Sequence, residues 1–272
     1  MISIRSKKND KRRYSKKELC PYLRFGNSYE NTKVEKHQVV QAIIHRLKTG
    51  CQWRELPMKQ FFAVEYKWQA VYYHFRKWSS DGSWEKLWKN LLSKHKSMLD
   101  LSSIQLDGTH TIVKRGGEKV GYQGRKKSKT TNLLMMTDNR GTPLACSDPI
   151  AGNHHDSHNL VATADKMVCS VDAAGISTEG LFLNADAGFD HKAFRVYCDS
   201  KEIIHNIDKN QRNGNKEEYL FDALLYRCRF VIERTNAWLD AFKALLVRFE
   251  TKQLHWRALH LIAFSVILLR RL

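Results

Sequence analysis

Three acidic residues stand in local contexts that could hold divalent metal ions. Asp107 and Asp186 each end a short apolar segment typical of a strand, and each precedes small residues that favour a turn. Glu233 lies in a segment whose apolar residues recur at helical spacing. Carboxylate oxygens are the ligands that Mg²⁺ prefers, and two such ions about 3.5–4 Å apart can activate a nucleophile and stabilise a leaving oxygen at phosphorus. The three acids therefore predict metal-assisted phosphodiester chemistry.

Each acid also has an ordinary structural interpretation. Asp107 and Asp186 could be acids in common strand-to-loop turns. Glu233 could form an intrahelical ion pair with Arg229, which lies four residues earlier. Taken singly, the residues leave both interpretations open, so the prediction of a metal site depends on all three together.

The segments that must position these acids predict a sheet from about residue 101 onward. Apolar or alternating stretches indicate strands at 103–107, 131–138, 144–150, 181–185 and 203–207, and residues 109–113 either continue the first strand or pair with it. Helical spacing indicates helices at 160–168, at 191–198 and from about 222 onward. Three strands in series, followed by alternating helix and strand, are typical of an α/β domain with strands of mixed direction. Acids at the strand ends of such a sheet can leave the core and meet in one cleft.

The first 100 residues predict a separate helical part. Helices are expected at 34–48, 61–78 and 84–91, the second with Val64 on its apolar face. Three amphipathic helices with basic outer faces indicate a small, helix-turn-helix-like DNA-binding domain, although a plain bundle with solvated lysines is the alternative. The expected division is a helical domain at 1–100 and a catalytic domain at 101–272.

The chain is strongly basic. It has 272 residues, with 46 Lys and Arg against 28 Asp and Glu, which gives a formal net charge of +18. Such a charge is costly in self-repulsion unless a polyanion screens it, so nucleic acid is the leading partner and an anionic membrane surface the second. Residues 1–18 carry eight basic residues and could form a phosphate-binding arm or a solvated tail. A second basic segment follows the first strand and is expected at the mouth of the cleft, in contact with phosphates: Lys114, Arg115, Lys119, Arg125, Lys126, Lys127 and Lys129.

Several other patterns limit the function classes. The six cysteines include no CxxC pair, which excludes a zinc ribbon and a thioredoxin-like motif. Residues 258–269 are the most apolar segment but are too short to span a bilayer, so they predict a buried core helix. The sequence NHHDSH at 153–158 could suggest zinc, but adjacent histidines seldom point at one ion. The basic N-terminus lacks the apolar stretch of a signal peptide, and a cytosolic protein is expected.

Four stretches carry a likeness to a known family. They are CQWRELP with YYHFRKW (51–57 and 72–78), LDGTH (106–110), NADAGFD (184–190) and YRCRFVIERTNAWL (226–239). These stretches resemble DDE transposases of bacterial insertion sequences, particularly the insertion-sequence-five group. In the last stretch Tyr226, Arg229 and Glu233 match the spacing of 0, +3 and +7 in the family's signature helix. The likeness extends over about residues 34–250, and the family also has an Asn-His-Asp loop like that at 153–158, which is therefore expected to border the active site.

The resemblance implies a transposase with an RNase H-like catalytic domain. Asp107 and Asp186 would lie on neighbouring strands and Glu233 on the following helix, as the catalytic and metal-binding residues. Mg²⁺ is the expected cofactor, for which Mn²⁺ can substitute, and Tyr226 and Arg229 are expected to contact DNA. The implied partner is double-stranded DNA, both terminal inverted repeats and target, bound by a homodimer or higher homo-oligomer in the prokaryotic cytoplasm at the nucleoid, without a membrane.

The sequence departs from the family pattern at one position. The family has a lysine seven residues after the glutamate, where this chain has Asp240. Asp240 is expected to point away from DNA or to pair with Lys243. Two other functions stay open: a catalytically silent DNA-binding regulator derived from a transposase, and an RNase H-like nuclease that hydrolyses without strand transfer. The helical N-terminal part favours the transposase, because a nuclease need not recognise specific DNA ends.

Overall fold

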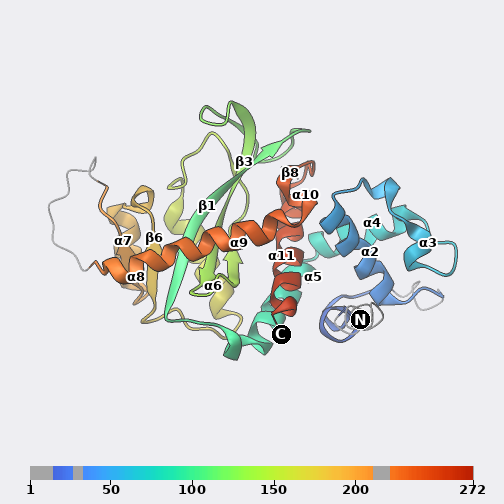
Figure 1. The fold of residues 1–272 in the computed structure, drawn as a ribbon, viewed down its shortest axis with the longest axis horizontal. Coiled ribbons are helices and arrows are strands. Elements are labelled where there is room, and N and C mark those ends of the chain that lie inside the picture. Colours follow the sequence, from blue (N-terminus) through green and yellow to red (C-terminus); the bar gives the residue numbers. More distant parts are fainter. Residues whose placement is uncertain (1–14, 27–32, 211–220, 272) are drawn as a thin grey trace, which may run out of the picture.

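A mixed β-sheet carries helices on its faces and joins a helical part formed by the N-terminal third of the chain (Figure 1). The computed structural model describes residues 15–26, 33–210 and 221–271. Most of the basic segment at residues 1–18 lies outside these ranges. Helices give way to strands between Met98 and Ser103.

The helical part consists of α2 (Lys36–Thr49), α3 (Met58–Phe61), α4 (Trp68–Ser80) and α5 (Ser83–Lys94). The predicted helix at 61–78 is wrong in its first half, because residues 62–67 are not helical. Val71, Phe75 and Trp78 form one buried face of α4. Phe61 and Val64 continue the spacing of that face toward the N-terminus, but the chain before Trp68 does not follow it. Val64 is accordingly 38% exposed instead of buried.

The strands form one sheet in the order β2-β3-β1-β6-β7, with β4 and β5 on β3 and β8 on β1. Their bounds are β1 (Ser103–Val113), β2 (Gly121–Gln123), β3 (Ser128–Asp138), β4 (Pro143–Cys146), β5 (Ile150–Ala151), β6 (Phe182–Ala185), β7 (Ile204–Ile207) and β8 (Val247–Arg248). β3 runs antiparallel to β1, while β6 and β7 run parallel to it and to each other. This confirms the predicted α/β class, a mixed sheet preceded by a helical region.

The strands settle one open alternative and differ from the sequence prediction in two places. Residues 109–113 continue the first strand, since every residue from Ile104 to Ile112 pairs with β3 and β1 extends to Val113. The strand expected at 144–150 is divided by residues 147–149 into β4 and β5. β2 and β8 were not predicted, since segments of three and two residues show no alternation to detect.

The remaining helices are α6 (Leu160–Asp172), α7 (Lys192–Ser200), α8 (Ala223–Arg227), α9 (Val231–Asp240), α10 (Lys243–Leu246) and α11 (Gln253–Arg270). A 3-10 turn, Cys228–Phe230, joins α8 to α9. Together they form the long helical ribbon that crosses in front of β1 in Figure 1. α11 packs against α4 and α5, so the two ends of the chain share one hydrophobic core. The predicted burial of 258–269 is confirmed. In the ranges described, no helix combines the length and apolarity needed to cross a membrane.

Candidate active site

Asp107 and Asp186 directly follow the last registered pair between two parallel strands. β1 and β6 pair from Ser103–Phe182 to Leu106–Ala185. Since side chains alternate between faces along each strand, the next residue of both strands points to the same face, and the two aspartates lie side by side.

The sheet opens beside Asp107. β6 ends at Ala185, whereas β8 joins the same side of β1 only at Ile112. Within the described ranges, the stretch of β1 from Asp107 to Thr111 therefore has no neighbouring strand on that side. The strand end expected at the first aspartate is thus the end of β6 and not of β1, which corrects the sequence prediction.

Main-chain amides orient both carboxylates. The amide nitrogen of Gly108 donates to Oδ1 of Asp107 at 2.8 Å, and that of Gly188 donates to Oδ1 of Asp186 at 2.8 Å. The second bond caps the 3-10 turn that begins at Ala187. Neither carboxylate forms an ion pair with another described residue, so an oxygen of each is available to a ligand.

The electrostatics of Asp107 depend on all three acids. Burial raises the pKa of Asp107 to about 6. The negative charges of Asp186 and Glu233 add to this rise. The Gly108 amide and the Arg229 charge oppose it. Glu233 itself is exposed on α9, and the alternative ion pair with Arg229 does not form within the described ranges. No three His, Cys, Asp or Glu side chains of the described residues lie close enough together to hold one ion. The three acids thus influence one another without forming a closed ligand set.

Tyr226 and Arg229 lie where the long helix approaches these carboxylates. The Arg229 guanidinium is 5.5 Å from the ring centre of Tyr226 and 5.3 Å from that of Phe230. Burial raises the pKa of Tyr226, and Asp186 contributes to the same rise. Nε of Arg229 is buried without a hydrogen-bond partner among the described residues. A 3-10 turn inside a helix often marks a functional hinge, and Arg229 lies within one here.

A ladder of three buried amide side chains crosses the parallel strands beneath the aspartates. Gln105, Asn184 and Asn206 occupy registered positions on β1, β6 and β7. Nδ2 of Asn206 donates to Oδ1 of Asn184 at 2.7 Å, and Nδ2 of Asn184 donates to Oε1 of Gln105 at 2.9 Å. Because Gln105 and Asn184 each lie two residues before an aspartate, the ladder and the carboxylates share one face of the sheet.

The ladder also holds the start of the helix that carries Glu233. Asn206 donates to the carbonyl oxygen of Asp222 and accepts from its amide, at 3.0 and 2.9 Å. Nδ2 of Asn184 donates to the carbonyl oxygen of Leu225 at 3.2 Å. Sequence analysis missed these residues, although polar side chains inside otherwise apolar strands, two positions before each acid, are a detectable signal.

Replacing Asn184 with leucine is expected to destabilise the protein by about 2–3 kcal/mol, because several buried polar groups lose their partners at once. Urea unfolding measures the change. The matched control is Asn90→Ala, since this half-buried side chain, among the described residues, bonds only the carbonyl oxygen of Lys86 in its own helix, and a change within about 0.5 kcal/mol is expected. An Asn184→Leu protein as stable as the control would contradict the role given to the ladder.

The loop at 153–158 borders both aspartates, which confirms its predicted place. A Cβ added at Gly108 would lie 2.6 Å from Oδ1 of Asp156, so this loop residue packs directly on the main chain beside Asp107. Asn132 donates to the same carboxylate oxygen, and Nε2 of His110 lies 3.5 Å from it. On the other side, Cε1 of His155 would be 3.7 Å from a Cβ added at Gly188.

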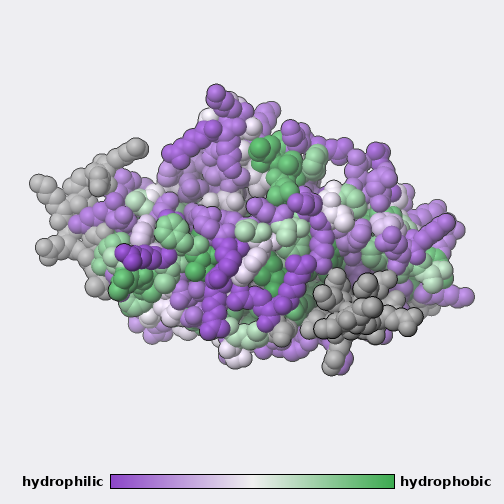
Figure 2. Space-filling model, in the orientation of Figure 1, coloured by the Kyte–Doolittle hydropathy of each residue, from purple (hydrophilic) through white to green (hydrophobic). Residues whose placement is uncertain are grey.

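The second basic segment, residues 114–129, forms a projecting ribbon that consists of β2 and the adjoining ends of β1 and β3. Lys114 and Arg115 follow β1, and Arg125, Lys126 and Lys127 form the turn between β2 and β3. Nζ of Lys126 donates to the carbonyl oxygen of His110 at 2.7 Å. Figure 2 shows this ribbon, at the top of the molecule, as predominantly hydrophilic.

Asp240 does not meet its expected partner. The helix predicted to continue through Phe242 and Leu246 ends at Asp240, and α10 begins at Lys243. Extended dihedral angles at Phe242 separate the two helices. Asp240 and Lys243 are both exposed, and no hydrogen bond or ion pair joins them in the structure as described. Of the two alternatives, pairing with Lys243 is therefore wrong, and orientation of Asp240 away from DNA stays a prediction.

Two family models match the chain. One, described as "Transposase DDE domain", matches residues 97–268, and the other, described as "Putative transposase of IS4/5 family", matches residues 17–88. No curated protein matches.

Solved structures with a similar arrangement include three complexes of one transposase. The crystal structure of a pre-cleavage Mos1 transpososome is 12% identical, with a TM-score of 0.31 over 89% of this chain and 80% of that chain. The Mos1 transposase paired-end complex with left transposon end is 13% identical, with a TM-score of 0.31 over 85% and 76%. The Mos1 mariner paired end complex with Mn is 12% identical, with a TM-score of 0.31 over 97% and 85%.

Proposed function

We propose that this chain cleaves DNA at transposon ends with the help of divalent metal ions and then joins those ends to target DNA. The chain belongs to the transposase DDE domain family. The family model spans more than half of the chain, and the protein is a DDE-type transposase. One observation carries the finer proposal. Asp107 and Asp186 lie side by side where the sheet opens, and the charge of Glu233 acts on Asp107.

The donor chemistry of this site fits a hard divalent cation. Asp107, Asp186 and Glu233 offer only carboxylate oxygens, and the repulsion among them would be relieved by a cation. Asp107 and Asp186 would hold it from the sheet, and Glu233 would approach from α9. Mg²⁺, or Mn²⁺ in its place, would supply activation of the attacking oxygen and neutralisation of phosphoryl charge.

The chain's own groups would orient the reacting DNA. Gly108 and Gly188 fix the two carboxylates through their amides. Arg229, whose Nε has no hydrogen-bond partner among the described residues, lies near Asp107 and would hold a phosphate, while the ring of Tyr226 would contact a base or sugar. His155 would limit solvent access from the loop side.

The assembly would be a homodimer or a higher homo-oligomer on DNA. A transposon has two ends, and cutting both within one complex needs at least two copies of the site. The helical part would recognise the terminal repeats, because its basic outer face is separate from the catalytic sheet.

One assay tests the proposal against its alternatives. The protein is incubated with labelled DNA from the repeats that flank its gene, a plasmid target and Mg²⁺. Labelled end joined to plasmid is the expected result. Nicked DNA without joining would indicate an RNase H-like nuclease, and a mobility shift without cleavage would indicate a silent regulator.

Neutralising the ribbon turn is expected to weaken the salt dependence of DNA binding. In an Arg125→Gln, Lys126→Gln, Lys127→Gln protein, the log–log slope of affinity against salt should fall by up to about 3, roughly one for each lost phosphate contact. The control protein has glutamine in place of three lysines outside the ribbon, and so loses the same charge: Lys94, Lys166 and Lys201. Each of these lysines already forms an ion pair with a carboxylate, so it is not expected to contact phosphate. Equal slopes for the two proteins would show that the ribbon is only a solvated turn.

A further inference from the structure

We propose that a cluster of three arginines beside the active site, on the side away from the basic ribbon, binds the phosphate backbone of target DNA. The arginine cluster consists of Arg140, Arg234 and Arg271: the last two lie against Trp238, and both donate to the carbonyl oxygen of Arg140. The inference rests on the proposed function, since strand transfer requires a second DNA segment at the same catalytic site.

The three arginines come from distant parts of the chain and meet at one carbonyl group. Nη2 of Arg234 and Nη1 of Arg271 both donate to the carbonyl oxygen of Arg140, at 2.8 and 3.1 Å. The guanidinium carbons of Arg234 and Arg271 are 5.5 and 5.0 Å from the ring centre of Trp238. Contact with an aromatic ring fixes a guanidinium plane without neutralising its charge.

The turn that presents Arg140 is held rigidly against α9. Oγ1 of Thr235 donates to the carbonyl oxygen of Gly141 at 2.7 Å. Gly141 has a φ of 75°, and an added Cβ would lie 3.1 Å from the carbonyl oxygen of Val231, so the close approach requires glycine. The buried carboxylate of Asp138 accepts the amides of Arg140 and Thr142, at 2.9 and 2.6 Å. The cluster is therefore organised before any ligand binds.

The charge of the cluster is poorly balanced by the protein. In the parts of the chain that the structure describes, the one carboxylate within 4 Å of its guanidinium groups is Asp100, 3.5 Å from Nε of Arg140. Arg234 and Arg271 each use one nitrogen on the carbonyl oxygen and keep their other donors for a ligand. Like charges held together at a surface repel, and the phosphates of DNA would offset that repulsion.

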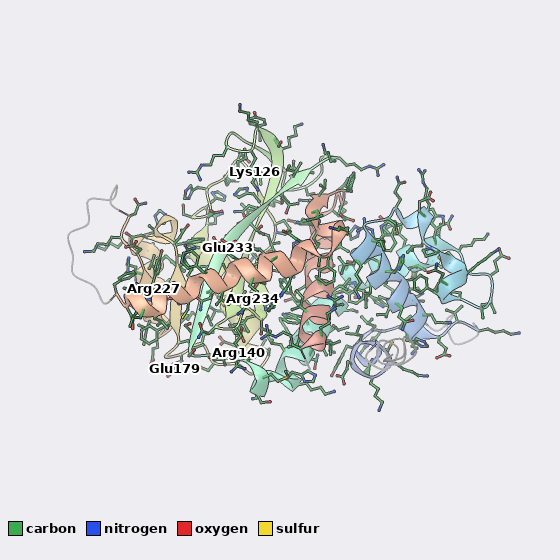
Figure 3. All side chains as sticks on the ribbon, viewed as in Figure 1. Lys126, Arg140, Glu179, Arg227, Glu233 and Arg234 are labelled. Carbon is green, nitrogen blue, oxygen red and sulfur yellow. The ribbon has the colours of Figure 1, made fainter. Side chains whose placement is uncertain are left out.

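The position of the cluster fits a second DNA segment. Arg234 is adjacent to Glu233 on α9, and the pairing of Ile104 with Asp138 places the Arg140 turn level with the start of β1. Asp107 lies three residues further along β1, or about 10 Å at 3.3 Å per residue. In Figure 3, Arg234 and Arg140 lie on one side of Glu233 and Lys126 lies on the other. The catalytic acids are thus flanked by two separate basic surfaces.

Target DNA suits the cluster better than the transposon end does. The three guanidinium groups lie on the flank of α9, on a turn and at the end of α11. From there they can reach phosphates, but no helix or strand of the cluster projects into a groove. Phosphate contacts carry no sequence information. The ribbon of β2 and β3 is a two-stranded element of the kind that a major groove admits. The ribbon would therefore face the recognised end, and the cluster would face DNA of any sequence.

The test compares binding and joining in the full-length Arg234→Gln, Arg271→Gln protein. Binding is measured without divalent metal, on a random duplex that lacks the terminal repeat, at several salt concentrations. We expect the log–log slope to fall by up to about 2. With pre-cleaved end DNA and Mg²⁺, the plasmid concentration for half-maximal joining should rise at least about tenfold. The binding result does not depend on catalysis, so an inactive protein would challenge the proposed function and leave this inference testable.

Two further proteins serve as controls. Lys166→Gln with Lys201→Gln removes the same charge from lysines that are paired with aspartates, and its slope should stay unchanged. The Arg234→Lys, Arg271→Lys protein keeps the positive charge and should retain most of the slope. Comparison with the glutamine protein therefore distinguishes an effect of lost charge from an effect of misfolding. The inference is overturned if the glutamine protein keeps the slope of the wild type. It is also overturned if affinity for end DNA falls as much as affinity for random duplex, or if joining falls while the half-saturating plasmid concentration does not change.

Discussion

Replacing Asp107 with asparagine is expected to abolish DNA cleavage and, at neutral pH, to make the metal-free protein more stable. Cleavage should fall on the order of 10³-fold or more, because the change removes a charged oxygen ligand from the proposed metal site. Stability should rise because Asp107 is held ionised beside Asp186 and Glu233 while it is largely removed from water. The same residue would thus be required for activity and costly for folding.

The stabilisation depends on pH in a defined way. The pKa of Asp107 rises from an ordinary value of 3.8 to about 6 in the folded protein. Its protonated form therefore stabilises the fold below about pH 4, and this contribution is lost as the pH rises through 6. Since one pKa unit corresponds to about 1.4 kcal/mol, the gain from asparagine at pH 8 is at most about 3 kcal/mol and is expected to be 1–2 kcal/mol after screening by water. At pH 4 the gain should be small.

Thermal unfolding of wild type and Asp107→Asn, at pH 4 and pH 8 with and without Mg²⁺, measures these effects. Mg²⁺ should raise the melting temperature of the wild type at pH 8 and have much less effect on the variant. Asp199→Asn is a suitable control, because that carboxylate is 66% exposed and far less affected by burial. A variant that still cleaves DNA, or one that melts below the wild type at pH 8, would contradict the assignment of Asp107.

The sequence was informative about the site wherever local pattern determines local structure. Asp107 and Asp186 follow apolar runs that form strands, and the spacing of Tyr226, Arg229 and Glu233 places them on one helical segment. The opening of the sheet beside Asp107 could not be predicted in this way. It arises because β6 stops at Ala185 and β8 joins β1 further along, which is a matter of pairing between distant segments.

Other features were missed for related reasons. The amide ladder depends on the register among three strands, which no single strand reveals. The 3-10 turn at 228–230 and the break after Asp240 interrupt a stretch whose apolar periodicity appears continuous in the sequence. In the non-helical segment at 62–67, Phe62 is only 5% exposed and is buried in the hydrophobic core, although the apolar spacing of this segment favours a helix. In each case tertiary contacts override local propensity.

A buried ion pair between the two ends of the chain is the clearest such contact. Nη2 of Arg46, on α2, lies 2.7 Å from Oε1 of Glu250, which follows β8, and both side chains are only 7% exposed. The Arg46 guanidinium is also 5.2 Å from the ring centre of Trp53. α2 and α10 pack together at the same place, where a Cβ on Gly50 would lie 3.1 Å from the main chain of Lys243. The pair therefore joins the helical part to the segment that follows β8, the strand that pairs with the far end of β1.

Removing one member of this pair is expected to destabilise the protein severely. Glu250→Ala leaves the Arg46 charge buried without a counter-ion, a change that costs about 3–5 kcal/mol in comparable pairs. The double replacement Arg46→Met with Glu250→Leu removes both charges and fills the space, so it should recover most of that loss. Urea unfolding of wild type, Arg46→Met, Glu250→Leu and the double variant yields the coupling between the two side chains.

An exposed pair provides the matched comparison. Lys166→Ala removes an ion pair of 3.3 Å whose side chains are 73% and 57% exposed, and it should cost no more than about 1 kcal/mol. The contrast tests burial as the cause, since both changes break one ion pair. A loss for Glu250→Ala as small as that for Lys166→Ala would mean that water reaches the buried pair. A double variant as unstable as Glu250→Ala would mean that the contact requires charge, because packing alone would then fail to hold α2 against the segment that follows β8.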